Sequence, residues 1–138
     1  MNNEEIDMKT KVSIIASNGG LFNAYQIFNI AISVAAMDVE VAIFFTLGGL
    51  NLIHKKTYKP LPIPIRNKHY EKGVQSANVL SISELVKIAK EMGVKMIACQ
   101  LTMDVMNIQK EDIMDGIDVG SAVTFFNFSK DANTKFTF

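Results

Sequence analysis

Short apolar runs typical of buried strands alternate along this chain with segments that have helical spacing. Val12 to Ala16 is followed by the turn Ser17-Asn18-Gly19-Gly20 and an apolar helical segment, and Val39 to Thr46 contains the unbroken apolar stretch Val41 to Phe45. An unbroken apolar strand is typical of a parallel sheet that is covered on both faces. The alternation therefore predicts a three-layer α/β/α domain with a mainly parallel sheet of about five strands.

The later elements also have recognisable boundaries. A helix is expected to begin after Ser81, because Glu84 stands at capping-box spacing, and to end at Gly93. Three further strands are expected, at Val94 to Ala98, Gly116 to Gly120 and Lys135 to Phe138. A last helix is expected at Ala122 to Lys130. Residues 1–138 then form one domain, and its ligand is expected at the carboxyl ends of the strands.

The first predicted helix, Leu21 to Met37, is apolar over most of its circumference. A sheet covers only one face of a helix, so the other apolar face meets a second subunit or a neighbouring helix of the same chain. The pattern therefore favours a homo-oligomer.

The charges and the cysteine content exclude several classes of protein. Fourteen Lys and Arg residues balance fourteen Asp and Glu residues, so no net field favours nucleic acid or an anionic membrane surface. The longest apolar run, Val41 to Ile53, contains two glycines and is shorter than the roughly twenty residues of a membrane-spanning helix. The single cysteine cannot form an internal disulfide, and the polar tail of residues 1–10 is unlike a signal or transit peptide. We therefore expect a cytoplasmic protein with no membrane or nucleic-acid partner.

Cys99 stands where the predicted strand Val94 to Ala98 gives way to a helical run. Backbone N–H groups at the start of a helix stabilise an anion, so this position suits a reactive thiolate. A lone cysteine is also often a small buried apolar residue. The residues alone leave both interpretations open.

Two further segments are expected near the same edge of the sheet. The turn Ser17 to Gly20 can bind an anion through backbone N–H groups or can be a tight turn only, and it lacks the spacing of a dinucleotide or Walker phosphate loop. The stretch His54 to Gly73 holds all three prolines and is basic, so we expect a long loop that binds an anionic ligand or acidic partner, or that is merely solvated. His54 and His69 match no short zinc spacing with Cys99, so no metal or other cofactor is expected.

The run Leu85 to Met106, with Gly116 to Gly120 downstream, resembles the DsrE/DsrF-like family and, within it, the DsrE-related branch labelled peroxiredoxin-like. The most specific part of the resemblance is Cys99-x-x-Thr102-Met103. The resemblance implies a flavodoxin-like sheet, small homo-oligomers, and a cysteine that carries sulfur as a persulfide or thiosulfonate. It also implies a TusA-like or rhodanese-like sulfur carrier as partner. This chain has Asn107 where relatives commonly have glycine, and it lacks the second cysteine of some relatives.

The leading hypothesis is a sulfur-trafficking protein in which Cys99 takes up a sulfane sulfur from a carrier or a small sulfur anion. The N–H groups of Leu101 and Thr102 and the Thr102 hydroxyl are expected to stabilise the anion, the Ser17 to Gly20 turn to line the pocket, and basic loop residues to close over it. The expected binding residues are Asn18, Gly19, Gly20, Lys55, Lys56, Arg66, Gln100, Leu101, Thr102 and Met103.

Two other functions stay open at this point. The first is a non-catalytic oligomeric module that binds a small anion or a nucleotide at the same edge. The second is a peroxidase, which would need an outside partner to reduce a sulfenic acid. The sequence also leaves open whether Cys99 turns over, as in a sulfurtransferase, or only carries sulfur.

Overall fold

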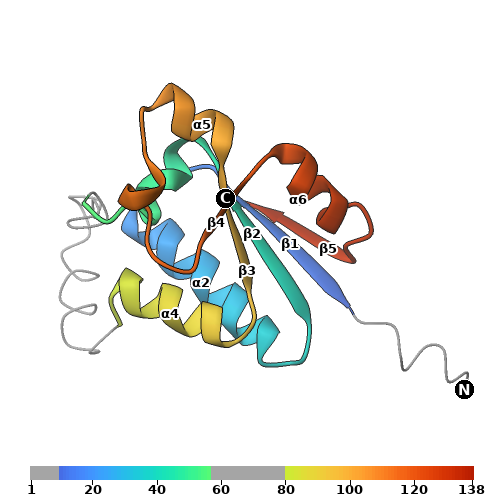
Figure 1. The fold of residues 1–138 in the computed structure, drawn as a ribbon. Coiled ribbons are helices and arrows are strands. Elements are labelled where there is room, and N and C mark those ends of the chain that lie inside the picture. Colours follow the sequence, from blue (N-terminus) through green and yellow to red (C-terminus); the bar gives the residue numbers. More distant parts are fainter. Residues whose placement is uncertain (1–9, 57–79) are drawn as a thin grey trace, which may run out of the picture.

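The computed structural model describes residues 10–56 and 80–138, which are built around one five-stranded sheet (Figure 1). The strands are β1 (Lys11–Ala16), β2 (Glu40–Phe45), β3 (Lys95–Cys99), β4 (Asp118–Gly120) and β5 (Thr134–Thr137). Their order across the sheet is β4-β3-β2-β1-β5, and every pairing is parallel. The predicted α/β class and the parallel sheet are therefore confirmed.

Helices cover both faces of the sheet. Helices α2 (Leu21–Ala35) and α4 (Ile82–Glu91) lie on one face, and α6 (Ala122–Ser129) lies on the other (Figure 1). Right-handed crossovers explain this division, because β1, β2 and β3 follow one another in one direction, whereas the chain returns from β4 past the sheet to β5. A short helix, α5 (Gln100–Val105), stands at the carboxyl end of the sheet.

The core has two parts because side chains alternate between the faces of each strand. The larger part lies under α2 and α4 and includes Ile43, Phe45, Met96 and Ala98. The smaller part lies under α6; its buried members are Ala42, Phe44, Ile97, Cys99 and Phe125. The side chain of Cys99 is therefore on the α6 face of the sheet.

The start of α4 has the predicted capping box. The backbone N–H of Glu84 donates to Ser81 Oγ at 3.2 Å, and the N–H of Ser81 donates to Glu84 Oε2 at 2.8 Å. Gly93, with a left-handed φ of 85°, follows the end of the helix. These contacts satisfy N–H groups that the first turn of a helix leaves without partners.

Two 3-10 helices were not predicted: η1 (Leu47–Leu52), directly after β2, and η2 (Lys110–Asp112). The close approach of η1 to the end of β1 depends on glycine, since a Cβ on Gly49 would overlap the carbonyl group of Ala16. The N–H of Thr46 donates to that same carbonyl at 3.0 Å. The chain leaving β2 is thus held against β1.

Candidate functional site

Cys99 is the last residue of β3 and directly precedes α5. Its exposed fraction is 7%, and its partner in the neighbouring strand β4 is Gly120. On the α6 face it belongs to the cluster that contains Phe44 and Phe125, whose rings stack with centroids 5.1 Å apart. The thiol therefore lies in an apolar setting at the carboxyl edge of the sheet.

Hydrogen bonds counteract this apolar setting. Burial is the largest single influence and raises the pKa of the Cys99 thiol, because it disfavours the charged form. The Thr102 hydroxyl, the Thr102 N–H, the Thr46 hydroxyl and the Leu101 N–H act as hydrogen-bond donors that favour the charged sulfur, and together they leave the pKa of Cys99 below its ordinary value. These donors therefore favour the thiolate form of Cys99.

Thr46 is a member of this site that the sequence hypothesis missed. The register of β2 and β3 pairs Phe45 with Ala98, so the next residues, Thr46 and Cys99, leave the sheet side by side. Thr46 Oγ1 also lies 3.2 Å from Thr102 Oγ1. The signal that could have found Thr46 is its position immediately after a strand that neighbours the strand of Cys99.

The expected residues that follow Cys99 fall into three environments. Leu101 is 71% exposed, whereas Thr102 and Met103 are buried, and Met103 packs in the larger core. The Gln100 amide nitrogen donates to Asp104 Oδ1 at 2.7 Å. Of these residues, Leu101 and Thr102 are the ones that hydrogen-bond to the thiol.

The turn Ser17 to Gly20 lies at the same edge but on the other side of β2. Because β2 separates β1 from β3, the ends of β1 and β3 are about 10 Å apart at ordinary strand spacing. Gly19 packs against the backbone of Gly48 in η1, Gly20 precedes α2 with a φ of 107°, and the Asn18 amide reaches the Ser17 hydroxyl at 3.5 Å. The structure therefore places this turn against η1, which in turn reaches Thr102.

The described basic residues of the predicted loop have other neighbours. Lys55 Nζ lies 3.7 Å from Asp115 Oδ1, and the Lys56 N–H donates to His54 Nδ1 at 3.0 Å. Arg66, His69 and most of the predicted 54–73 loop lie outside the described residues. Among residues 10–56 and 80–138, no group of three or more metal-ligating side chains comes together.

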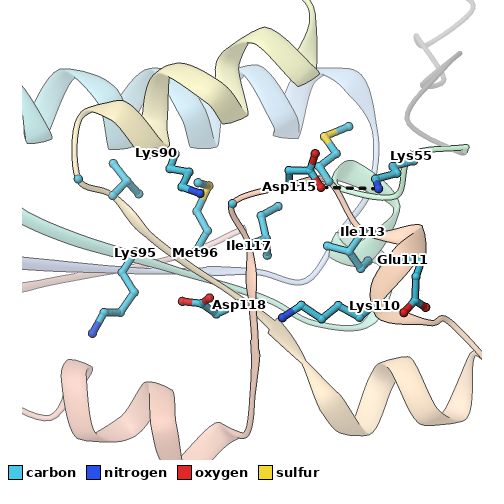
Figure 2. A pocket seen from close by; sticks show the side chains of 14 residues that line it. Lys55, Lys90, Lys95, Met96, Lys110, Glu111, Ile113, Asp115, Ile117 and Asp118 are labelled. Atoms are coloured by element: carbon cyan, nitrogen blue, oxygen red, sulfur yellow. Dashed lines mark ion pairs between the residues drawn. The ribbon is translucent and has the colours of Figure 1, made fainter.

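Lys55 also lines a cavity of about 720 Å³ beside β3 and β4, shown in Figure 2. Its floor is apolar and includes Met96, Ile113 and Ile117, and its rim carries charged side chains of both signs, lysines and carboxylates. Cys99 is not among the lining residues. This cavity is thus separate from the thiol site.

Exposed apolar side chains come from the elements that meet at Cys99. Leu101 and Val105 stand one turn apart on α5 and are 71% and 78% exposed, and Leu47 of η1 and Val123 of α6 are exposed as well. We call these four residues the apolar rim. Where exposed apolar side chains form one contiguous patch, that patch is typical of a protein-docking site.

The sequence model of the DsrE/DsrF/DrsH-like family matches residues 8–68 and 63–137. This chain belongs to the DsrE/DsrF/DrsH-like family. The predicted resemblance is thereby confirmed.

Two other proteins are similar to this chain in sequence. The chain is 33% identical over 150 residues to the "Sulfur carrier protein DsrE2" of Allochromatium vinosum, covering 89% of this chain and 94% of that protein. It is 26% identical over 141 residues to the "Uncharacterized protein YrkE" of Bacillus subtilis, covering 83% and 88%. A sulfur-related role for this member of the DsrE/DsrF/DrsH-like family follows in general terms.

Solved structures share the fold of this family member. The ychN protein from E. coli superposes with a TM-score of 0.68 at 15% identity, covering 95% of this chain and all of that one. MTH1491 from Methanobacterium thermoautotrophicum, titled a protein of unknown function, gives 0.67 at 14% identity, covering 93% and 99%. Within the part of the chain that the structure describes, no helix has the length and apolar character needed to span a membrane.

Proposed function

We propose that this protein carries sulfane sulfur on Cys99, as a persulfide or a thiosulfonate. The observation that supports this most directly is the set of hydrogen-bond donors around one buried thiol, which lower its pKa against the effect of burial. A thiolate is the form of cysteine that attacks sulfur. The name of the A. vinosum relative, a sulfur carrier protein, agrees with this chemistry.

The loading step is a sulfur exchange without net oxidation. The Cys99 thiolate attacks the outer sulfur of a donor persulfide R–S–SH, so that a new S–S bond forms to Cys99 and the donor's own S–S bond breaks. The donor leaves as R–S⁻, and the transferred sulfur keeps its proton. The thiosulfonate forms from tetrathionate, when the thiolate attacks one of its two inner sulfurs, the bond between the inner sulfurs breaks and thiosulfate leaves. The N–H and hydroxyl groups that stabilise the thiolate then stabilise the ionised persulfide. The thiolate of an acceptor removes the sulfur by the reverse reaction.

The partner in this proposal is a small sulfur carrier protein of the TusA-like or rhodanese-like kind. The thiol is nearly buried, while Leu101 and Val105 beside it are strongly exposed. A protein that covers the apolar rim can bring its own cysteine to the sulfur and bury apolar surface at the same time. Such exchange requires reduced thiols, so we place the protein in the cytoplasm.

Release of the bound sulfur by cyanide tests the proposal. The native protein is incubated with polysulfide, desalted and treated with cyanide, which converts sulfane sulfur to thiocyanate. We expect about one thiocyanate per chain from the native protein and none from Cys99→Ser. Equal release from both proteins would show that the sulfur is not held on Cys99.

A binding module without thiol chemistry is the competing function, and the 7% exposure of Cys99 is the observation in its favour. Alkylation separates the two functions. A carrier thiol reacts rapidly with iodoacetamide in the folded protein at neutral pH, whereas a purely structural cysteine reacts only after unfolding.

A further inference from the structure

Two groups at the junction of β2 and η1 meet the hydroxyl group of Thr102. Thr46 Oγ1 and the backbone nitrogen of Leu47 each lie 3.2 Å from Thr102 Oγ1. Thr102 is 6% exposed, so water does not compete freely for this hydroxyl. The hydrogen bonds from this junction therefore set the orientation of the Thr102 hydroxyl group.

The direction of these hydrogen bonds follows from what each group can do. A backbone N–H only donates, so Leu47 occupies a lone pair of Thr102 Oγ1. The Thr102 and Thr46 hydroxyls each have one proton, and the hydrogen bond between them uses one of the two. Both hydroxyls also favour the charged form of the Cys99 sulfur. An ionised sulfur is a stronger acceptor than a hydroxyl oxygen, so both protons turn to the thiolate when it forms.

The backbone of Leu47 is held in an unusual conformation to make this contact. Its φ is 49°, in the left-handed region that leucine rarely adopts and that costs about 1 kcal/mol or more. The neighbouring residues fix it: the Thr46 N–H donates to the Ala16 carbonyl at 3.0 Å, and the Gly49 N–H donates to the Thr46 carbonyl at 2.9 Å. The strain is thus located where the Leu47 N–H meets Thr102.

We propose that Thr46 and Leu47 are positioning residues for the sulfur chemistry of Cys99. The Leu47 N–H donates a hydrogen bond to Thr102 Oγ1, which leaves the Thr102 proton free to point to the sulfur. The Thr46 hydroxyl adds a second hydrogen-bond donor from the end of the adjacent strand. The inference rests on the proposed function, because it concerns stabilisation of the anion that carries sulfur. It extends the site to residues that follow β2.

The test is the pH profile of Cys99 alkylation by iodoacetamide in the full chain. Removing one hydrogen bond to a charged acceptor is expected to lower the thiolate fraction at neutral pH about tenfold in Thr46→Val, and similarly in Thr102→Val. Thr46→Ser keeps a hydroxyl group and is expected to restore the native profile. A native profile in Thr46→Val would overturn the role of Thr46.

Leu47 is tested with two substitutions that both keep its N–H. Leu47→Gly adopts a left-handed backbone without strain, so its profile is expected to remain native. Leu47→Ile has the same volume, but a β-branched residue strongly disfavours this conformation, so the N–H shifts and the profile moves to higher pH. Equal profiles for Leu47→Ile and the native protein, with the fold verified by circular dichroism, would overturn the role of Leu47.

The charged side chains on the elements around Cys99 are the same in all these variants. They are Glu40 on β2, Lys95 on β3, Asp104 on α5 and Asp118 on β4, so differences between profiles report the hydrogen bonds. Alkylation does not depend on sulfur loading. A shifted profile in a protein that takes up no sulfur would refute the proposed function, and with it the positioning role in sulfur chemistry, and would leave only the effect of Thr46 and Leu47 on the thiolate. Sulfur uptake with unshifted profiles would refute the positioning role alone.

Discussion

At the scale of single residues, the pKa of Cys99 reflects two opposed effects. Burial beside Phe44 and Phe125 favours the neutral thiol, and hydrogen bonds from both sides of the β3 end favour the thiolate. The hydrogen bonds prevail in the folded protein. A cysteine that is inert because it is buried would lack them.

The lowered pKa predicts how stability depends on pH. Between the pKa of the folded state and the ordinary value of 9.0, the folded protein binds fewer protons than the unfolded chain, so the stabilising contribution of Cys99 grows as pH rises through this window. It is complete above the unfolded pKa and is lost as pH falls through the folded pKa. Urea unfolding under reducing conditions should show that the free energy of unfolding of the native protein rises relative to that of Cys99→Ser from neutral pH upward. A difference between the two free energies that shrinks over that range would contradict the lowered pKa.

At this scale the sequence predicts some site residues and misses others for a physical reason. Cys99, Leu101 and Thr102 lie within four consecutive residues, so their meeting at a strand end follows from local structure. Thr46 comes from a different strand, and its place depends on the β2–β3 register, which pairs Phe45 with Ala98. Sequence patterns predict strands more readily than they predict register.

At the scale of elements, η1 connects the two halves of the carboxyl edge. It contacts the Ser17 to Gly20 turn through Gly48 and reaches Thr102 through Leu47. The sequence predicts the strands on either side, because their apolar runs are unbroken. It does not predict η1, because the need for Gly49 arises from a contact with Ala16 that is distant in the chain.

Gly49→Ala tests the placement of η1. The added Cβ overlaps the Ala16 carbonyl group, so we expect a loss of about 2 kcal/mol or more in the free energy of unfolding, measured with urea, and slower alkylation of Cys99 at neutral pH. Gly93→Ala is the matched control, since its added Cβ meets nothing within 4 Å and only its left-handed backbone costs about 1 kcal/mol. Equal losses in both variants would argue against a tight η1–β1 contact.

The apolar rim makes a separate prediction about the partner. Leu101→Glu places a charge on the rim beside Cys99, and it is expected to slow sulfur transfer from a persulfidated carrier protein at least tenfold while polysulfide still loads the thiol. Met37→Glu, at another exposed apolar residue just after α2, is the control and should transfer at the native rate. Transfer rates can be followed by mass spectrometry of both proteins, and an unaffected Leu101→Glu would exclude the rim as docking surface.

At the scale of the whole molecule, the outer face of α2 is the feature that bears on assembly. Its buried residues lie on one side, and a largely apolar groove of about 590 Å³ runs between α2 and α4. Ile32 and Ile88 are among the side chains that line it. The predicted homo-oligomer would cover such a surface.

Sedimentation measures the assembly directly. We expect the native protein to sediment as a homo-oligomer and Ile32→Glu to sediment as a monomer, because a charge cannot be buried in an apolar interface without a partner. Glu91→Gln, at the end of α4, is a control that should keep the native assembly. A native protein that sediments as a monomer would refute the predicted oligomer, whereas an oligomeric Ile32→Glu would place the interface elsewhere.

The fold as a whole was the most predictable level. The alternation of strands and helices, the capping box at Ser81 and the carboxyl-edge position of Cys99 are local patterns, and the structure has all three. The predicted covering of the site by Lys55, Lys56 and Arg66 depends on a long connection rather than on a repeating pattern. Of these residues, Lys55 is found beside Asp115, and its predicted role at the thiol stays a prediction.

In the proposed function, Cys99 holds a sulfur atom that is delivered from outside. Intact-protein mass spectrometry of the native protein and Cys99→Ser, after incubation with thiosulfate, tetrathionate or polysulfide, tests it most directly. We expect a gain of about 32 Da for a persulfide or about 112 Da for a thiosulfonate, in the native protein alone. No adduct with any donor, or the same adduct in Cys99→Ser, would contradict it.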